Sequence, residues 1–103
     1  MNVIVAGHRY RVQCFENKGA YALIQFIHKE PKQEGSSELV TVCDGTTNEE
    51  VLKVLIDRMK YLNNKMECDE NKQVISHLEE SLKLLEERTA KRTKRNVEGT
   101  NEL

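Results

Sequence analysis

The chain has 103 residues, with 16 Lys and Arg side chains against 17 Asp and Glu, so its formal net charge at pH 7 is −1. This near-neutrality argues against general binding of nucleic acids, which normally requires a strong basic excess, so any anion site must come from a few placed basic side chains. The length suits one domain, but so short a chain buries a modest share of its surface, and association with further copies is a common source of the missing core.

The cysteines and the hydropathy pattern indicate a protein of a reducing, aqueous compartment. The chain has three cysteines, an odd number, at the widely spaced positions Cys14, Cys43 and Cys68. This pattern implies neither a disulfide framework nor a zinc motif. The N-terminal apolar stretch is too short for a signal peptide, and the sequence has no run of about 18 apolar residues. We therefore expect a soluble cytoplasmic protein without a metal, a cofactor or a membrane partner.

Alternating apolar and polar residues in the first 44 positions predict short β-strands separated by turns. The segment 29–37 holds the only proline and is expected to be a loop. The first half should therefore form one antiparallel sheet of three or four strands. The expected strands cover 3–5, 9–14, 21–27 and 38–43, with turns at 6–8 and 17–19.

After Asp44-Gly45 the hydrophobic period changes to that of a helix. Thr47 followed by Glu50 has the spacing of a capping box, so a helix should begin there and end near 63–64. Its apolar residues at helical spacing are Val51, Leu55, Arg58 or Met59, and Leu62, flanked by Leu52 and Ile56.

A second helix is expected from Cys68 or Asp69 to about Lys94. Its residues show the three-four spacing of an apolar stripe on one face. Two amphipathic helices that are joined by a short loop form an antiparallel hairpin. The apolar residues of this helix are Val74, Ile75, Leu78, Leu82, Leu84 and Leu85.

Together these elements predict an α+β fold in a single domain that covers 1–103. A small N-terminal antiparallel β-sheet (1–44) precedes a C-terminal antiparallel helical hairpin (46–95), and a tail (96–103) lacks periodicity. We expect this fold to be oligomeric.

Two arginines continue the apolar stripe of the second helix. Steps of three and four residues beyond Leu85 reach Arg88 or Thr89 and then Arg92. Arginine rarely occupies such a face without an acidic partner or a bound anion, and a pair one turn apart can grip a phosphate or pyrophosphate. The alternative is that these cations only complement the negative end of the helix dipole.

Two further side chains are candidates for recognition of a nucleotide. Asn71 lies at the start of the second helix near its stripe, and its amide offers both a donor and an acceptor to a base or ribose edge. Tyr61, near the end of the first helix, can stack on a nucleobase. The alternatives are an ordinary first-turn residue for Asn71 and packing within the hairpin for Tyr61.

Signals of an enzyme are weak. His8, His28 and His77 stand apart in the sequence, and each is more typical of a surface or packing residue than of a catalytic base. The motifs of serine hydrolases, P-loop proteins and zinc proteases are missing, and the paired glutamates of the second helix fall on its solvated side. We therefore expect a protein that is not an enzyme and has no catalytic residue.

The second half of the chain resembles the helical hairpin that is shared by phage nucleotide sponges, the Thoeris anti-defence and CBASS anti-defence proteins. The strand-rich first half suits the Thoeris branch by its architecture. The matching segments are NEEVLKVLIDRMKYLN (Asn48 to Asn63), CDENKQVISHLEESLKLLEERTAKR (Cys68 to Arg92) and NVEGT (Asn96 to Thr100).

The resemblance implies a function that spacing alone does not. It implies a phage protein of the host bacterial cytoplasm that binds glyco-cyclic ADP-ribose, the signal made by the host's TIR-domain protein, and holds it without cleaving it, which blocks Thoeris immunity. It also implies a homo-oligomer, as a dimer or a hexamer, and in some members separate sites for the cyclic oligonucleotides of CBASS.

Carried over residue by residue, the resemblance implies a set of ligand-binding positions in this chain. Tyr61 is at the position of an aromatic stacking residue. The chain departs from the family at Asp69, where an arginine is usual, and this removes a positive charge that a second, charge-dependent site would use. The implied ligand-binding residues are Tyr61, Asn71, Arg88, Thr89, Arg92, Gly99 and Thr100.

Three rival functions remain open at this point. A protein-interaction module that inhibits a host defence enzyme directly would use the apolar face of the hairpin. A small nucleic-acid-binding regulator would use the basic cluster at 88–95, and its binding would depend strongly on salt. An enzyme that degrades the signal would return products instead of the intact molecule.

Overall fold

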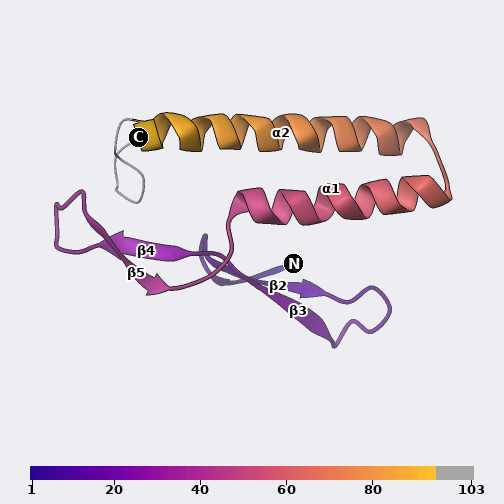
Figure 1. Cartoon of the computed structure of the whole chain (residues 1–103). Helices are drawn as coiled ribbons and strands as arrows, with labels where there is room; N and C mark the ends of the chain where they lie inside the picture. The colour runs from indigo at the N-terminus through magenta and orange to yellow at the C-terminus, as the bar shows by residue number, and fades with distance from the viewer. Residues whose placement is uncertain (95–103) are drawn as a thin grey trace. The chain divides into compact units, whose positions relative to one another are not determined.

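The computed structural model describes residues 1–94 of the chain (Figure 1). The chain divides into two compact units, Met1–Thr47 and Asn48–Leu103. We call the first the sheet unit and the described helices of the second the hairpin. Each unit is described by itself.

The sheet unit begins with a three-stranded antiparallel sheet in the order β1-β2-β3. Gly7 has a φ of 78° in the turn between the first two strands, a conformation that glycine adopts without the steric cost of a side chain. The strands are β1 (Asn2–Val5), β2 (Arg9–Gln13) and β3 (Tyr21–Gln25). The expected strands at the start of the chain and the turns between them are therefore confirmed.

A second sheet corrects two predictions for the middle of this unit. Strand β4 (His28–Pro31) pairs antiparallel with β5 (Leu39–Cys43), so 29–37 is not a loop throughout and the five strands form two sheets instead of one. Pro31 ends a strand in a two-stranded sheet, where a missing N–H is tolerated at the edge. The expected strand at 21–27 is confirmed for Tyr21–Gln25 and ends two residues early, because the chain leaves the first sheet after Gln25.

Backbone contacts at Phe26 and Gly45 explain that departure. The Phe26 N–H donates to the His8 carbonyl at 2.7 Å, and the Ile27 N–H donates to the Thr46 carbonyl at 2.9 Å. A Cβ at Gly45 would lie 2.4 Å from the Gln25 carbonyl oxygen, so only glycine allows this approach. Gly45 therefore lies where the chain segments of the two sheets approach each other most closely.

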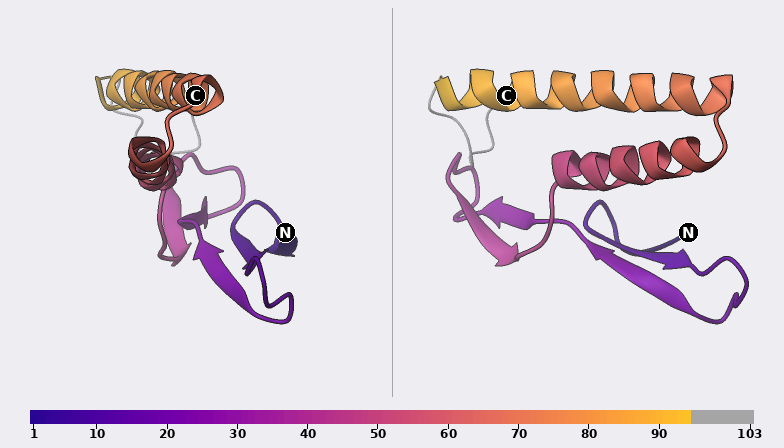
Figure 2. Two further views of the ribbon diagram at one scale, coloured as in Figure 1. Left: turned by 90° about the vertical axis from the view of Figure 1, so that its right-hand side faces the viewer. Right: turned by 45° about the vertical axis from the view of Figure 1, so that its right-hand side comes forward.

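The hairpin consists of α1 (Asn48–Lys65) and α2 (Asp69–Lys94), which lie side by side and run antiparallel (Figures 1 and 2). Both predicted helices are confirmed, and α1 ends one residue beyond the predicted end. Acidic residues in the first turn of each helix and basic residues in the last turn complement the helix dipole.

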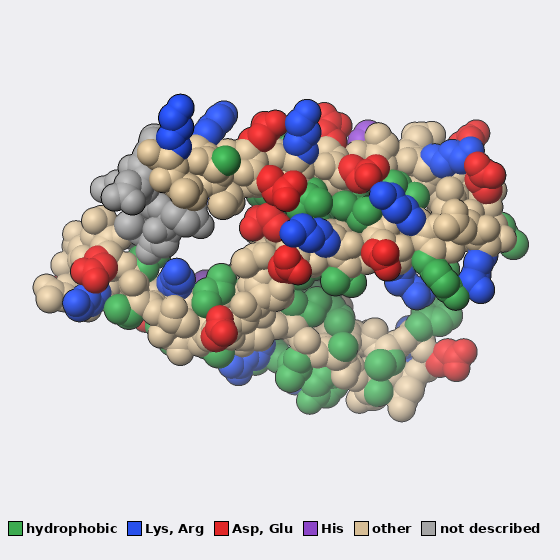
Figure 3. All heavy atoms as spheres, viewed as in Figure 1, with side chains coloured by type: hydrophobic (Ala, Val, Ile, Leu, Met, Phe, Trp, Pro, Cys, Tyr) green, Lys and Arg blue, Asp and Glu red, His purple; other side chains and the backbone are tan. Residues whose placement is uncertain are grey.

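The seam between the helices is defined by half-buried residues that recur every three and four positions. In α1 the expected buried positions Val51 and Met59 are half-buried, whereas Leu55 and Leu62, expected on the same face, are 44% and 36% exposed. Hydrophobic side chains of the seam are visible between the helices in Figure 3. The seam comprises Leu52, Ile56, Met59 and Asn63 of α1, and Asn71, Ile75, Leu78, Leu82 and Leu85 of α2. Thr89 and Arg92 continue the same side of α2 where that helix extends beyond the start of α1 (Figure 1).

Apolar burial is sparse in the described part of the chain. Among residues 1–94, Ile56, at 8% exposure, is the one hydrophobic side chain that is buried, whereas Val54 remains 69% exposed. So small a core is a reason to expect further burial on self-association. No helix within residues 1–94 is both long and apolar enough to cross a membrane.

Candidate functional site

The C-terminal part of α2 places its two candidate arginines differently. Arg92 is half-buried, and its Nε atom is withdrawn from solvent, whereas Arg88 is exposed. Thr89, four residues beyond Leu85, is half-buried on the same side of α2. The expectation that Arg88 continues the buried face is therefore wrong for this chain by itself. The ligand roles of all three residues stay predictions.

The turn end of the hairpin carries the other two candidates. Asn71 is half-buried in the first turn of α2, and its side-chain amide makes no hydrogen bond within residues 1–94. Tyr61 is 56% exposed, with the Lys65 Nζ atom 5.0 Å from its ring centroid. Packing within the described hairpin therefore leaves much of the Tyr61 ring exposed, so the ring is accessible for stacking.

A single hairpin does not bring Asn71 close to Arg88. Asn71 and Arg88 are 17 positions apart in the same helix. At about 1.5 Å per residue, this separation is roughly 25 Å along the helix axis. A small-molecule pocket of roughly 300–1,000 Å³ is only about 10 Å across. Gly99 and Thr100 lie outside the described residues, so their positions are not compared.

A groove of about 400 Å³ lies between the two helices but is not the predicted site. Lys60 of α1 and Glu79 of α2 form an ion pair across it at 3.2 Å. Its two lysines are balanced by two carboxylates, so it offers no excess of positive charge to an anion. The groove is lined by Lys53, Ile56, Asp57, Lys60, Glu79 and Leu82.

Two arginines of β2 form a basic face that the sequence analysis did not single out. Arg9 Nε donates to Gln25 Oε1 at 2.5 Å, and the Arg11 guanidinium carbon lies 4.5 Å from the centroid of the Tyr21 ring. Within residues 1–94 neither arginine forms an ion pair with a carboxylate, so their charge is available to an anion. The spacing of Arg9 and Arg11 indicates this face in the sequence, because residues two apart in a strand lie on the same side of the sheet.

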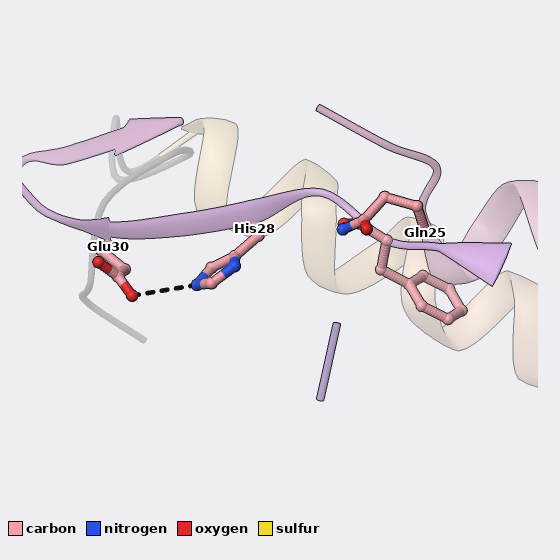
Figure 4. A network of polar contacts seen from close by, with 4 residues as sticks. Gln25, His28 and Glu30 are labelled. Atoms are coloured by element: carbon pink, nitrogen blue, oxygen red, sulfur yellow. Dashed lines mark hydrogen bonds and ion pairs between the residues drawn. The ribbon is translucent and has the colours of Figure 1, made fainter. Parts of the chain in front are cut away.

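Two of the three histidines that stand apart in the sequence, His8 and His28, meet in the sheet unit. The rings of His8 and His28 are stacked at a centroid distance of 3.7 Å, and His28 Nε2 lies 3.1 Å from Glu30 Oε1, the contact drawn in Figure 4. Within residues 1–94 no group of three potential metal ligands is found. The pair thus makes a packing contact between the two sheets.

An ion pair at the turn of the hairpin gives a prediction about pH. The Lys72 ammonium donates to Glu67 at 2.5 Å, and this hydrogen bond, together with the charge of Lys72, lowers the pKa of the Glu67 carboxyl. The stabilisation is present above the ordinary pKa of the carboxyl and is lost as the pH falls through the lowered pKa. We expect Glu67→Gln to lower the midpoint of thermal unfolding slightly at pH 7 and to have no effect at pH 2. An equal effect at both pH values would contradict this assignment.

Comparison with known proteins adds evidence from outside the chain. No family model matches it. It is similar to a protein described as Thoeris anti-defense 1 from Bacillus phage SBSphiJ7, with 43% identity over 60 residues. The similarity covers 57% of this chain and 42% of that protein, so the chain spans less than half of that relative's length. The predicted resemblance to Thoeris anti-defence proteins is confirmed.

Proposed function

We propose that this chain is a phage anti-defence protein that captures a cyclic ADP-ribose-type signal, with glyco-cyclic ADP-ribose as the ligand, and so blocks Thoeris immunity in the cytoplasm of the host. The single observation that carries the proposal is the similarity to Thoeris anti-defense 1. The polar residues at the two ends of the hairpin seam add the chemistry that such a ligand requires.

The pocket of this proposal lies between copies of the chain. Asn71 and Arg88 are roughly 25 Å apart along one helix, which exceeds the width of a pocket for one small ligand. A second copy whose α2 runs antiparallel to the first brings its arginine end to the Asn71 end of the first copy. Two equivalent pockets then arise in each symmetric pair, which fits a homodimer or a hexamer made of three pairs.

The chemistry of the ligand suits these side chains. A pyrophosphate carries two negative charges, and charge-assisted hydrogen bonds contribute roughly 1.5–3 kcal/mol each. Stacking of the adenine on Tyr61 adds about 1–3 kcal/mol. The exposed state of Arg88 in the isolated hairpin leaves its guanidinium accessible to a ligand that sits between copies.

Capture without cleavage is the proposed mode of action. A protein that withholds a signal needs slow release and an enclosing site, and it needs neither a base nor a nucleophile. The test is to mix the protein with glyco-cyclic ADP-ribose, remove free ligand, denature the protein by heat and analyse what is released. Recovery of the intact ligand is expected, whereas recovery of cleaved products or of no ligand would contradict capture.

Direct inhibition of a host defence enzyme is the second candidate function. The observation that favours it is the row of exposed apolar side chains on α1, of which Val54 is the most exposed. This function predicts that the chain co-purifies with a host protein and has no affinity for the nucleotide. The near-neutral net charge counts against a nucleic-acid-binding regulator.

A further inference from the structure

A short chain of hydrogen bonds at the turn of the hairpin ends at Asn71. Asn63, in the last turn of α1, accepts the backbone N–H of Cys68 through Oδ1 at 3.1 Å. Cys68 immediately precedes α2, and its Sγ accepts the backbone N–H of Asn71 at 3.4 Å. All three residues are half-buried, whereas residues 64–67 between them are exposed.

This arrangement makes Cys68 the N-cap of α2. An N-cap side chain accepts the N–H of the third helical residue, which is here Asn71, and so satisfies a group that the helix itself leaves unpaired. The Lys72 N–H donates to the Cys68 carbonyl at 3.2 Å, which is the first backbone bond of the helix. Sulfur is a weaker acceptor than the oxygen of the usual N-cap residues, and the bond from Cys68 to Asn63 adds a second restraint.

The same contacts fix where the side chain of Asn71 projects. Within residues 1–94 its amide makes no hydrogen bond, so its position follows from the backbone of the first turn of α2. A displacement of about 1 Å is enough to misalign a recognition group that contacts a ligand. Residues that set this backbone therefore act on the ligand without touching it.

We propose that Asn63 and Cys68 are positioning residues that hold the Asn71 amide in place to read the base or ribose edge of the captured nucleotide. This inference rests on the proposed function, because it takes Asn71 as a ligand contact. Asn63 reaches across the turn from α1 and fixes Cys68, and Cys68 fixes the first turn of α2. The same two side chains thus tie the helices together and hold in place the residue that recognises the ligand.

The test compares variants that remove an acceptor with variants that keep it. We expect Cys68→Ala and Asn63→Ala each to weaken binding of glyco-cyclic ADP-ribose roughly threefold to tenfold. Cys68→Ser and Asn63→Asp retain an acceptor, so they are expected to bind within about twofold of the wild type. Asn64→Ala is the matched control, since it removes a neighbouring amide that is exposed. Competition calorimetry gives the affinities, and thermal unfolding shows that each variant is folded.

A second arm separates positioning from a general loss of stability. In an Asn71→Ala background, Cys68→Ala should have no further effect on affinity, because the group that it positions is gone. An equal loss in both backgrounds would show a merely structural role and overturn the inference. Wild-type affinity for Cys68→Ala would also overturn it, and would leave the proposed function standing. A wild-type chain that does not bind the ligand would remove both.

Discussion

Arg92→Ala is expected to abolish capture of the cyclic nucleotide at concentrations where the wild type is saturated, while assembly is retained. Arg92 is the one arginine of α2 that is half-buried. Loss of a charge-assisted contact to a desolvated phosphate weakens binding by about 10- to 150-fold. Arg88→Ala is expected to act in the same direction, because the ligand would lie between copies of the chain. Titration calorimetry measures the affinity, and native mass spectrometry measures the assembly.

Two controls distinguish a specific contact from a general loss of charge. Lys91→Ala removes an exposed cation adjacent to Arg92 and should leave the affinity within about twofold. Arg92→Lys keeps the charge but loses the planar fork of donors, so its affinity should fall most of the way to that of Arg92→Ala. An Arg92→Ala variant that binds as tightly as Lys91→Ala would exclude Arg92 from the ligand site.

Ile56→Ala is expected to produce the largest loss of stability of any single truncation in the described hairpin. Ile56 is 8% exposed on the seam, and replacing a buried isoleucine by alanine typically costs 2–5 kcal/mol in the free energy of unfolding. With so little other burial in residues 1–94, we expect about 2–3 kcal/mol and a clear drop in the midpoint of denaturant unfolding. The measurement is made at fixed protein concentration, since association changes the apparent stability.

Val54→Ala provides the comparison within the same helix. Val54 is 69% exposed, so its truncation should change the free energy of unfolding by less than about 0.5 kcal/mol if no partner covers it. If a second copy covers this side of α1, the loss should grow with protein concentration as dimers form. An Ile56→Ala variant as stable as Val54→Ala would contradict the seam described here.

The helices were predictable because strong local signals mark their ends. Thr47, the first residue of the capping-box spacing with Glu50, immediately precedes α1, and the acidic start and basic end of α2 match its bounds. The face by which α1 meets α2 was not predictable, because α1 carries two apolar sides. Leu55 and Ile56 are equally good candidates until the partner helix is in place.

The strands were predictable where side chains alternate and not where pairing alone creates the strand. Tyr10 and Val12 show the alternation of β2, whereas His28–Pro31 has no apolar alternation and becomes β4 through its hydrogen bonds with β5. The stack of His8 on His28 depends on the same non-local contacts. Sequence reasoning therefore missed the second sheet and the histidine pair together.

The burial of the candidate residues was predictable in part, whereas their ligand roles stay predictions. Helical spacing placed Asn71 near the apolar stripe of α2 and Arg92 on it, and both residues are half-buried in the structure. Spacing alone did not decide whether Arg88 or Thr89 lies on the buried side of α2, because that depends on how the helices pack. The length of α2, which separates Asn71 from Arg88 by roughly 25 Å, is the feature that points to a pocket shared by copies.

Native mass spectrometry of the purified chain, with and without glyco-cyclic ADP-ribose, tests the central claim most directly, since it reports the number of copies and the bound mass together. We predict an even-numbered oligomer that gains the mass of the unmodified ligand, with up to one ligand for each copy. A monomer that gains no mass, or an assembly from which only fragments of the ligand are recovered, would contradict capture between copies.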